Sequence, residues 1–471
     1  MRRRLRLTKC LFLLACLQAQ LPLVAAEDTL IAGGTDLLRQ LQNYQALLED
    51  LESEFGPYHI SLLEPLDSME ELWLEQGDFQ RVAELQNRQL QVIRTVLGLQ
   101  HPDLVPRLRA IITNQMRLGN WERISDHLLH IRNLLSSDTD VARQDVLQAI
   151  DDQAYWHLSR VYLDKPRQRA RNLMAARELF DEMERLAEDS FGEDSPQMIP
   201  WLYKQAVNKY QLVEFLNASG GLGPDTMRRL IREDGMAKLQ LYAPRSFFPW
   251  DTSFIPIIDG DKPIGEAYLR EGLNLVVRIR SIAEAQGDLE AEAMAIIYHG
   301  DFQLLMDQGR GLRKYREARE KLQSAGILET RIEEFFNQPT PIPVDRYFSK
   351  LEDAIAYQRS SLNQIGPIAS EIVHLGVFSA WNESVPATQL PVQDDPFWDL
   401  NLSYNQIDLK FSISSRGGAS STKVIGSVPD ETSVRSEARR AVRDMQFRPA
   451  IFAGRSRRVR DVQIRYLFLV E

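Results

Sequence analysis

Apolar residues recur along most of the chain at intervals of three and four, the spacing that places side chains on one face of an α-helix. The first clear stripe consists of Leu66, Met69, Leu72, Trp73 and Leu74. The stripe on the next predicted helix consists of Val82, Leu85, Leu90 and Ile93. Gly77 lies between the two stripes. Because glycine readily adopts the left-handed conformation that closes a helix, we expect Gly77 to separate a pair of helices.

The same pattern repeats after 42 residues. Phe55-Gly56 corresponds to Leu97-Gly98, and Gly77-Asp78-Phe79 corresponds to Gly119-Asn120-Trp121. Phe191-Gly192 has the same form, although only Phe55-Gly56 and Leu97-Gly98 lie 42 residues apart. An apolar residue follows six positions after each of these Phe-Gly or Leu-Gly glycines, and these residues are Leu62, Leu104 and Met198. A fixed period with matched turns predicts helix pairs that stack on one another, because a single pair cannot bury its apolar face.

The last seventy residues change to a period of two, which indicates half-buried strands. Strands are predicted over 407–413 and 420–428, with a glycine turn at Gly417-Gly418, and a long final strand over 462–470. Between them, apolar residues at helical spacing predict a helix ending near Met445. The predicted fold is therefore mainly α: an α-solenoid followed by a small α+β domain of order β-β-α-β.

Breaks in the helical pattern divide the chain. A glycine-rich joint lies at 220–224, and 243–264 is rich in proline and aromatic residues. We expect helical repeats over 27–218, a loop-rich connection over 219–270, further repeats over 271–366, a linker over 367–400 and the α+β domain over 401–471. In the connection, Phe247, Phe248 and Trp250 either pack into the helical body or line a groove that binds a partner.

The N-terminus has the order of a secretory signal: five basic residues, a short apolar stretch, and small residues before Glu27. Cleavage after Ala26 is predicted, which places the protein in the periplasm. An uncleaved membrane anchor and lipidation at Cys16 are alternatives. Cys10 and Cys16 are the only cysteines, so a cleaved chain contains no thiol and no disulfide. No later stretch is apolar enough to span a membrane.

Charge is divided unevenly along the chain. The chain carries a formal net charge of −10, whereas residues 401–471 contain 13 Lys or Arg against 7 Asp or Glu. An acidic body therefore bears a basic terminal domain. The two parts are expected either to meet different partners or to contact each other. Export argues against nucleic acid as a partner of the basic run at 455–460.

The helix pairs resemble the tetratricopeptide repeat in its longer form. The link Gly98-Leu99-Gln100-His101-Pro102 carries the resemblance, together with the matched turns over about 55–135. A small alanine at the helix-packing position is present at Ala318, whereas Val82 and Ile124 stand there in the earlier units. The resemblance implies a superhelix with an extended binding surface for peptides or helices.

The α+β region resembles the C-terminal domain of the TonB energy-transducer family. The motif Gln446-Phe447-Arg448-Pro449-Ala450, with Gly454 after it, carries the resemblance. In that family the domain binds a peptide segment that adds as a strand to an exposed sheet edge. The implied edge here is the final strand from Arg460 to Leu469, and the implied partner-binding residues on it are Arg460, Gln463, Arg465, Leu467 and Leu469.

The sequence contains no recognisable catalytic or cofactor motif. His127 and His130 lie three residues apart on one predicted helix, but no third ligand is placed to complete a metal site. Paired acids such as Asp151-Asp152 are expected to be solvated. No cofactor and no metal is predicted. The leading hypothesis is a non-enzymatic periplasmic adaptor that binds protein or peptide partners in the cell envelope. The alternatives are a TonB-type transport component coupled to an outer-membrane receptor and an envelope hydrolase.

Overall fold

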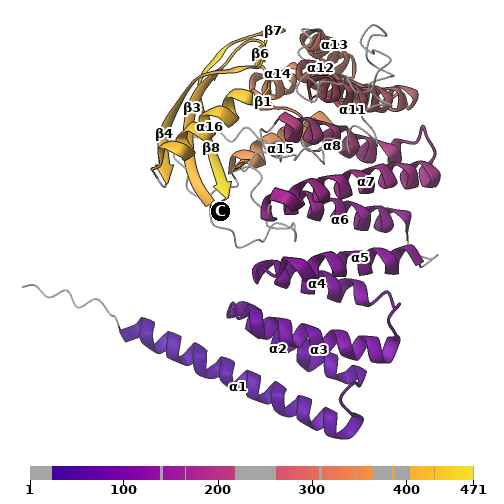
Figure 1. The fold of residues 1–471 in the computed structure, drawn as a ribbon, viewed down its shortest axis with the longest axis vertical. Coiled ribbons are helices and arrows are strands. Elements are labelled where there is room, and N and C mark those ends of the chain that lie inside the picture. Colours follow the sequence, from indigo (N-terminus) through magenta and orange to yellow (C-terminus); the bar gives the residue numbers. More distant parts are fainter. Residues whose placement is uncertain are drawn as a thin grey trace, which may run out of the picture. The chain divides into compact units, whose positions relative to one another are not determined.

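The computed structural model describes residues 24–137, 142–164, 166–217, 261–306, 310–344, 346–363, 384–386, 404–428 and 430–469. These residues are mainly helical, with a small sheet region near the C-terminus (Figure 1). The chain divides into two compact units, Met1–Leu99 and Gln100–Glu471. Residues 1–23, the larger part of the predicted signal, and Phe247, Phe248 and Trp250 lie outside the described residues. Within the described ranges, no helix combines the length and the apolarity that crossing a membrane requires.

The first unit is built from helices. It contains α1 (Val24–Phe55), the 3-10 turn η1 (Ile60–Leu62), α2 (Leu63–Glu75) and α3 (Phe79–Leu97). Its core gathers apolar residues from all four elements, including Leu48, Leu62, Leu66 and Val92. One carboxylate, that of Glu70, is buried between α2 and α3. The side-chain amides of Gln86 and Gln89 each donate to one of its oxygens, at 2.7 Å. Its hydrogen-bonding capacity is thus met within the helix pair.

The sequence repeat corresponds to a repeat of backbone geometry. Gly77 and Gly119 both have φ near +71°, in the left-handed region that closes a helix. The side chains of His59, His101 and Ser195 stand in equivalent places, and each accepts a hydrogen bond from the backbone N–H two residues later. The apolar residues that follow are wholly buried, and they are Leu62, Leu104 and Met198. The spacing of six residues therefore identifies one packing position in three places.

The helices of the second unit follow one another in packed pairs (Figure 1). They are α4 (Leu104–Arg117), α5 (Trp121–Ser137), α6 (Arg143–Leu163), α7 (Pro166–Phe191), η2 (Pro196–Met198), α8 (Ile199–Asn217), α11 (Asp261–Ala285), α12 (Leu289–Leu305), α13 (Gly311–Ser324), α14 (Glu329–Asn337) and α15 (Leu351–Asn363). Helix α12 is buried over almost its whole length, from Ala291 to Leu304. A helix that is buried on all sides forms the centre of a packed region, and polar side chains on it require partners.

The prediction that Asp151 and Asp152 are solvated is wrong. Both lie on α6 and are buried. Arg109 Nη1 of α4 lies 3.0 Å from Asp152 Oδ2, and Lys204 of α8 forms an ion pair with Asp151. Burial raises the pKa of both carboxyls, and the two basic partners oppose that rise. The acids therefore link α6 to α4 and α8, which is a tertiary role that their spacing in the sequence does not reveal.

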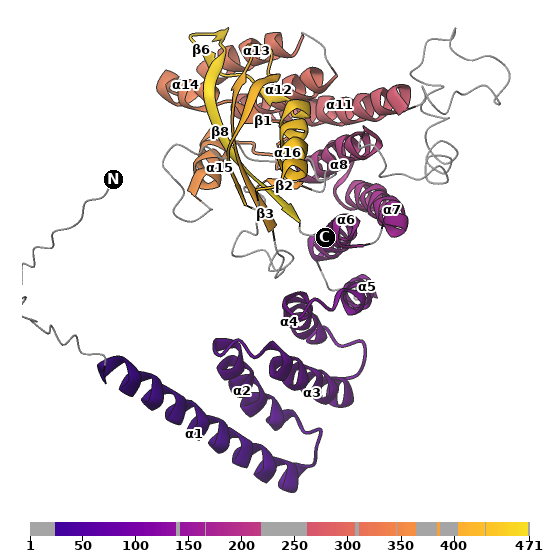
Figure 2. The ribbon, with the colours of Figure 1, turned by 60° about the vertical axis from the view of Figure 1, so that its left-hand side comes forward.

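The C-terminal region contains one four-stranded antiparallel sheet. Its strands are β2 (Ser384–Pro386), β3 (Tyr404–Ile413), β4 (Ala419–Val428) and β8 (Val459–Leu469), in the order β2-β8-β3-β4. Helix α16 (Thr432–Asp444) packs on β3 and β4 (Figure 2). Its Ala438, Ala441 and Val442 meet a buried row of β3 that includes Leu409 and Phe411. The long elements β3, β4, α16 and β8 follow one another in the predicted order.

Three short strands lie between α16 and β8. They are β5 (Phe447–Arg448), β6 (Ile451–Phe452) and β7 (Arg455–Ser456). β6 and β7 pair with each other, whereas β5 pairs with β1 (Thr340–Pro341), a strand between α14 and α15. The motif from Gln446 to Ala450 therefore lies where the sheet region meets the helices.

Candidate functional site

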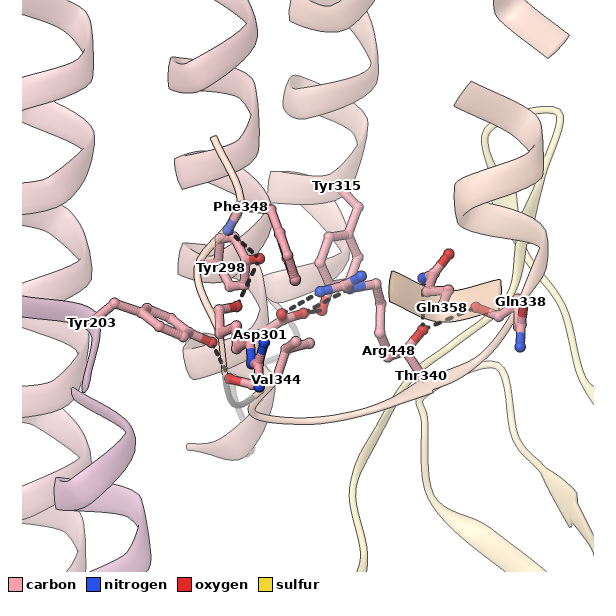
Figure 3. Close-up of polar contacts among 11 residues, drawn as sticks. Tyr203, Tyr298, Asp301, Tyr315, Gln338, Thr340, Val344, Phe348, Gln358 and Arg448 are labelled. Atoms are coloured by element: carbon pink, nitrogen blue, oxygen red, sulfur yellow. Dashed lines mark hydrogen bonds and ion pairs between the residues drawn. The ribbon is translucent and has the colours of Figure 1, made fainter. Parts of the chain in front are cut away.

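A buried ion pair joins the C-terminal sheet region to the helices of the same unit (Figure 3). Arg448 comes from β5 and Asp301 from α12, 147 residues apart in the sequence. Arg448 Nε donates to Asp301 Oδ1 at 2.9 Å, and Nη2 donates to Oδ2 at 2.5 Å. Arg448 is 2% exposed and Asp301 is 0% exposed. This two-pronged geometry is the strongest form of an arginine–carboxylate contact, and it fixes orientation as well as distance.

The surroundings of this pair complete its hydrogen bonding. Tyr315 of α13 donates its hydroxyl to Asp301 Oδ1 at 2.7 Å. Burial and the neighbouring carboxylate of Asp301 raise the pKa of Tyr315, so the hydroxyl keeps the proton that it donates. The Arg448 guanidinium lies 5.0 Å from the ring centre of Phe335 and 5.9 Å from that of Tyr315. Aromatic faces at this distance attract a cation, which offsets part of the cost of its burial.

Backbone hydrogen bonds extend this attachment of the sheet region to the helices on both sides of Arg448. Thr340 and Pro341 pair with Arg448 and Phe447, and the Ile342 N–H donates to the Gln446 carbonyl at 3.0 Å. On the other side, the Phe447 N–H donates to the Gly417 carbonyl at 2.9 Å. The β3–β4 turn, the β5 segment and the β1 segment therefore form one continuous backbone ladder.

Gly417 is required in this ladder. Its φ is +89°, and a Cβ atom at this position would lie 1.9 Å from the carbonyl oxygen of Phe447. A side chain would therefore both strain the backbone and displace the β5 segment that carries Arg448.

Tyrosines of the helices hold the segment between α14 and α15. Tyr203 of α8 donates to the Val344 carbonyl at 2.6 Å, and Tyr298 of α12 donates to the Arg346 carbonyl at 3.1 Å. The Tyr298 hydroxyl also accepts from the Phe348 N–H at 3.0 Å (Figure 3). Buried backbone groups outside a helix or sheet need such partners. The segment that carries β1 is therefore held on the helices independently of Arg448.

A second contact lies at the β6–β7 hairpin. The Ala453 N–H donates to both carboxylate oxygens of Glu333 on α14, at 3.2 and 3.3 Å. Arg319 of α13 pairs with the same Glu333 and with Glu329. Two charged groups of the helices, Asp301 on α12 and Glu333 on α14, thus hold the C-terminal sheet region. The contact that the charge division allowed, between an acidic body and a basic terminal domain, is present within this unit.

This buried ion pair attaches the sheet region to the helices. Neither Asp301 nor Arg448 is accessible to solvent, and each charge is neutralised by the other. Across the described ranges, no three His, Cys, Asp or Glu side chains gather in a way that would hold a metal ion.

The structure covers part of the sheet edge that the sequence predicts, at 466–468 of the final strand. The final strand, β8, was expected to be an edge, but it lies between β3 and β2. Ser384 of β2 pairs with Phe468, and Pro386 pairs with Tyr466. Because β2 comes from the linker before β3, it covers the outer side of the last part of β8. Among the described strands of this sheet, the second edge is β4, which pairs with β3 alone.

The residues proposed for partner binding on β8 have different environments. Arg460 is exposed, whereas Gln463 is buried. Arg465, Leu467 and Leu469 belong to the backbone of β8, but their side chains lie outside the described residues. The partner-binding role of all five stays a prediction.

His299, next to Tyr298 on α12, provides a test of the burial of this helix. Its ring contacts Gln303, and its Nδ1 has no hydrogen-bond partner within the described part of the chain. Burial lowers the pKa of His299 to about 4, and the charges of Lys314 and Arg280 act in the same direction, opposed by Glu317. In the unfolded chain the pKa of histidine is about 6.5. His299 therefore stays neutral in the folded protein at pH 5 to 6.

We predict that stability falls as the pH is lowered from about 6.5 to about 4, because the unfolded state then binds a proton that folded His299 does not. The contribution of His299 is on the order of 2 kcal/mol after allowance for solvent screening. Urea unfolding of the wild type and of His299→Gln at pH 7 and pH 5 measures it. The variant should lose less stability between the two pH values. Asp151 and Asp152 are present in both proteins, so their pH response cancels in the comparison. Equal losses of stability in both proteins would contradict the prediction.

Comparisons with known proteins assign no family. No family model and no curated protein matches the sequence. Among solved structures, the crystal structure of BtubC (BKLC) from P. vanneervenii is similar, with 14% sequence identity and a TM-score of 0.29. The match covers 65% of this chain and 94% of that chain. A TM-score of this size carries no argument about fold or function.

Proposed function

We propose that the protein is a non-enzymatic adaptor of the cell envelope, located in the periplasm, that binds protein or peptide partners. In this proposal the helix pairs are tetratricopeptide-like repeats of an α-solenoid, and the sheet region is a TonB C-terminal-like domain. The recurrence of the 42-residue sequence period as matched glycine turns and matched buried residues supports the first assignment. The order of strands and helix around the Gln446–Ala450 motif supports the second.

One observation carries the proposal: the β4 edge belongs to a sheet that is fixed to the helices. The buried pair of Arg448 and Asp301 holds the sheet region in one orientation, while β4 pairs with β3 alone among the described strands. An unpaired edge presents backbone N–H and C=O groups to an extended peptide, which adds to the sheet as a further strand.

Apolar side chains project from this edge strand. Ile425 is 50% exposed and Val428 is 65% exposed. Exposed apolar residues on an edge strand provide contacts for the side chains of an added peptide, which the backbone hydrogen bonds alone do not supply. The excess of basic residues in 401–471 favours a peptide that carries acidic residues.

The proposal is tested with the full chain and two matched variants. Ile425→Asp places a charge on the β4 edge, and Leu129→Asp places the same charge at an apolar position of α5 that is 45% exposed. Each protein is used to capture partners from an extract of the cell envelope. We expect a partner that the wild type and Leu129→Asp recover equally and that Ile425→Asp recovers at least tenfold less.

Two outcomes would contradict the proposal. If the wild type recovers nothing above background, the adaptor proposal is wrong. If all three proteins recover the same partner equally, the β4 edge is not the site that binds it. Circular dichroism of the two variants verifies that both are folded.

A further inference from the structure

The hairpin formed by β6 and β7 carries a dense group of arginines that the proposed function does not use. Residues 455–460 contain four arginines and no acid. Their side chains are exposed, and they are Arg455, Arg457, Arg458 and Arg460. Across the described residues none of the four forms an ion pair with an acid, and the next acid along the chain, Asp461, pairs with Lys410 at 3.1 Å. Several positive charges therefore face solvent without a counter-ion from the described part of the chain.

The hairpin is fixed in place beside α14 (Figure 2). Its two-residue turn, Ala453-Gly454, has φ of +48° and +74°, and a tight turn between antiparallel strands favours positive φ at both positions. The Arg457 N–H donates to the Ala450 carbonyl at 2.8 Å, which closes the open end of the hairpin. Together with the contact between Ala453 and Glu333, these features fix the backbone that carries the arginines.

One face of the hairpin is buried and the other is open. Ile451 is 3% exposed, whereas its neighbour Phe452 is 43% exposed. Phe452 pairs with Arg455 across the two strands, so these two side chains lie on the same, open face. The guanidinium of Arg457 lies 4.3 Å from the ring centre of Phe452. An aromatic ring and two cations therefore project together, and the contact with the ring orients the Arg457 guanidinium.

The acids of α14, the helix that β6 contacts, are engaged by other bases. Arg319 pairs with Glu329 and Glu333, and Arg331 pairs with Glu334. These pairs satisfy the acids within the helices, so the charge of the hairpin arginines stays available to a partner. Charge complementarity then requires that the partner be anionic.

We propose that the open face of the hairpin binds an anionic membrane surface. Arg455, Arg457 and Arg458 pair with the phosphates of lipid headgroups, and the Phe452 ring lies at the level of those headgroups. A guanidinium matches a phosphate with two parallel hydrogen bonds. Each basic residue close to an anionic bilayer adds to the attraction, which falls off within a Debye length. Aromatic rings concentrate at the boundary between headgroups and acyl chains.

The exposed ring favours a membrane over an acidic peptide or a nucleic acid. A ring beside cations matches a surface that is charged outside and apolar beneath, which is the arrangement of a lipid leaflet. β6 and β7 have two residues each and pair with each other, so the hairpin presents little backbone to an added peptide strand. A nucleic acid supplies the charge, but the proposed location in the cell envelope argues against it, and to that extent the choice rests on the proposed function.

Sedimentation of the full chain with lipid vesicles tests the proposal. One set of vesicles contains phosphatidylcholine with anionic phosphatidylglycerol, and the other contains phosphatidylcholine alone. We expect at least tenfold tighter binding to the anionic vesicles at low salt, and weaker binding as salt is raised. Polyglutamate and duplex DNA, matched to the lipid in concentration of anionic groups, are tested separately and should bind at least tenfold more weakly than the anionic vesicles.

Variants of the hairpin then locate the site. The triple variant Arg455→Ala, Arg457→Ala and Arg458→Ala should lose at least tenfold in affinity for the anionic vesicles. Phe452→Ala keeps every charge and removes the ring, and it should also bind these vesicles more weakly.

A control variant removes the same number of charges from another surface. Arg439→Ala, Arg440→Ala and Arg443→Ala together remove three exposed arginines from α16, and they should change the affinity by less than about threefold. All variants share the basic and apolar residues of 2–26, so any contribution of that segment to vesicle binding cancels in the comparison.

The proposal is overturned if the wild type binds both sets of vesicles equally, or if polyglutamate or duplex DNA binds as tightly as the anionic vesicles. It is also overturned if the hairpin and α16 triple variants, both folded by circular dichroism, lose affinity equally, or if Phe452→Ala binds as well as the wild type. The assay contains only the purified chain and a lipid, a peptide or DNA. Its failure therefore leaves the capture of partners through the β4 edge untouched, and a failed capture leaves vesicle binding untouched.

Discussion

Replacing Arg448 by alanine should lower the free energy of unfolding by about 3–5 kcal/mol, the cost of leaving a buried charge without its partner. Asp301 would keep its place on α12 with a single donor, Tyr315, and without a counter-ion. The loss would fall on the attachment of the sheet region to the helices. Urea unfolding followed by circular dichroism measures the change. Limited proteolysis of the folded variant should show faster cleavage near β5.

A double variant separates two effects on the free energy of unfolding: the cost of leaving one charge without its partner, and the net contribution of the ion pair. Arg448→Met with Asp301→Leu replaces both ions by apolar groups, and such replacements are often neutral or stabilising. We therefore expect the double variant to be more stable than either single variant. Arg458→Ala, at an exposed position of the same region, is the matched control and should change stability by no more than about 0.5 kcal/mol. Equal effects of Arg448→Ala and Arg458→Ala would contradict the importance of the joint.

If the double variant is as stable as the wild type, the ion pair specifies orientation and contributes little to stability. Its geometry supports that interpretation, because two directed hydrogen bonds and a third from Tyr315 allow one arrangement of the sheet region on α12. For an adaptor, a fixed orientation would set the distance between the β4 edge and the binding surface of the helices.

The periodic parts of the fold could be predicted from the sequence. The spacing of three and four identified the helix pairs, and the alternation after Ile407 identified the hairpin and the final strand. Both signals arise because one side of each element is buried, so apolar residues recur in the sequence with the period of that element. The turn glycines Gly77 and Gly119 were predictable for a related reason, since only a residue that tolerates positive φ closes a helix in this way.

The contacts between distant elements could not be predicted in the same way. β2 has three residues and ends at Pro386, so it carries no strand pattern, and its pairing with β8 depends on the path of the linker. The sequence predicts that Asp151 and Asp152 are solvated, because their partners, Arg109 and Lys204, lie on other helices. In each case the deciding interaction is tertiary and leaves no local period.

The buried pair did leave a signal in the sequence. Asp301 is an acid within a helix whose other residues are mostly apolar, and Arg448 is a base between Phe447 and Pro449. A charge inside an apolar run requires a partner if the run is buried. That argument identifies each residue as one half of an ion pair, although it does not identify which acid belongs to which base.

Leu104→Ala should destabilise the second unit by about 2–5 kcal/mol, because it removes a buried side chain at the start of α4 and leaves a cavity. Leu104 is 0% exposed, and Leu99, five residues earlier, is 61% exposed. Leu99→Ala is therefore the matched control, and its effect should be no more than about 0.5 kcal/mol. Urea unfolding of the two variants measures the difference. Similar losses for both would show that Leu104 is not a core position.

A further variant tests whether the sequence period marks one packing position. Met198 stands where Leu104 stands in its own repeat, and Leu62 stands there in the first unit; all three are wholly buried. If the position is equivalent, Leu104→Met should cost less than about 1.5 kcal/mol, since it keeps the volume and the apolar character that the site selects. A large loss with Leu104→Met would mean that the matched spacing arises without matched packing. A small loss, together with the large loss from Leu104→Ala, would show that the six-residue spacing after the Phe-Gly or Leu-Gly pair marks a repeated core contact.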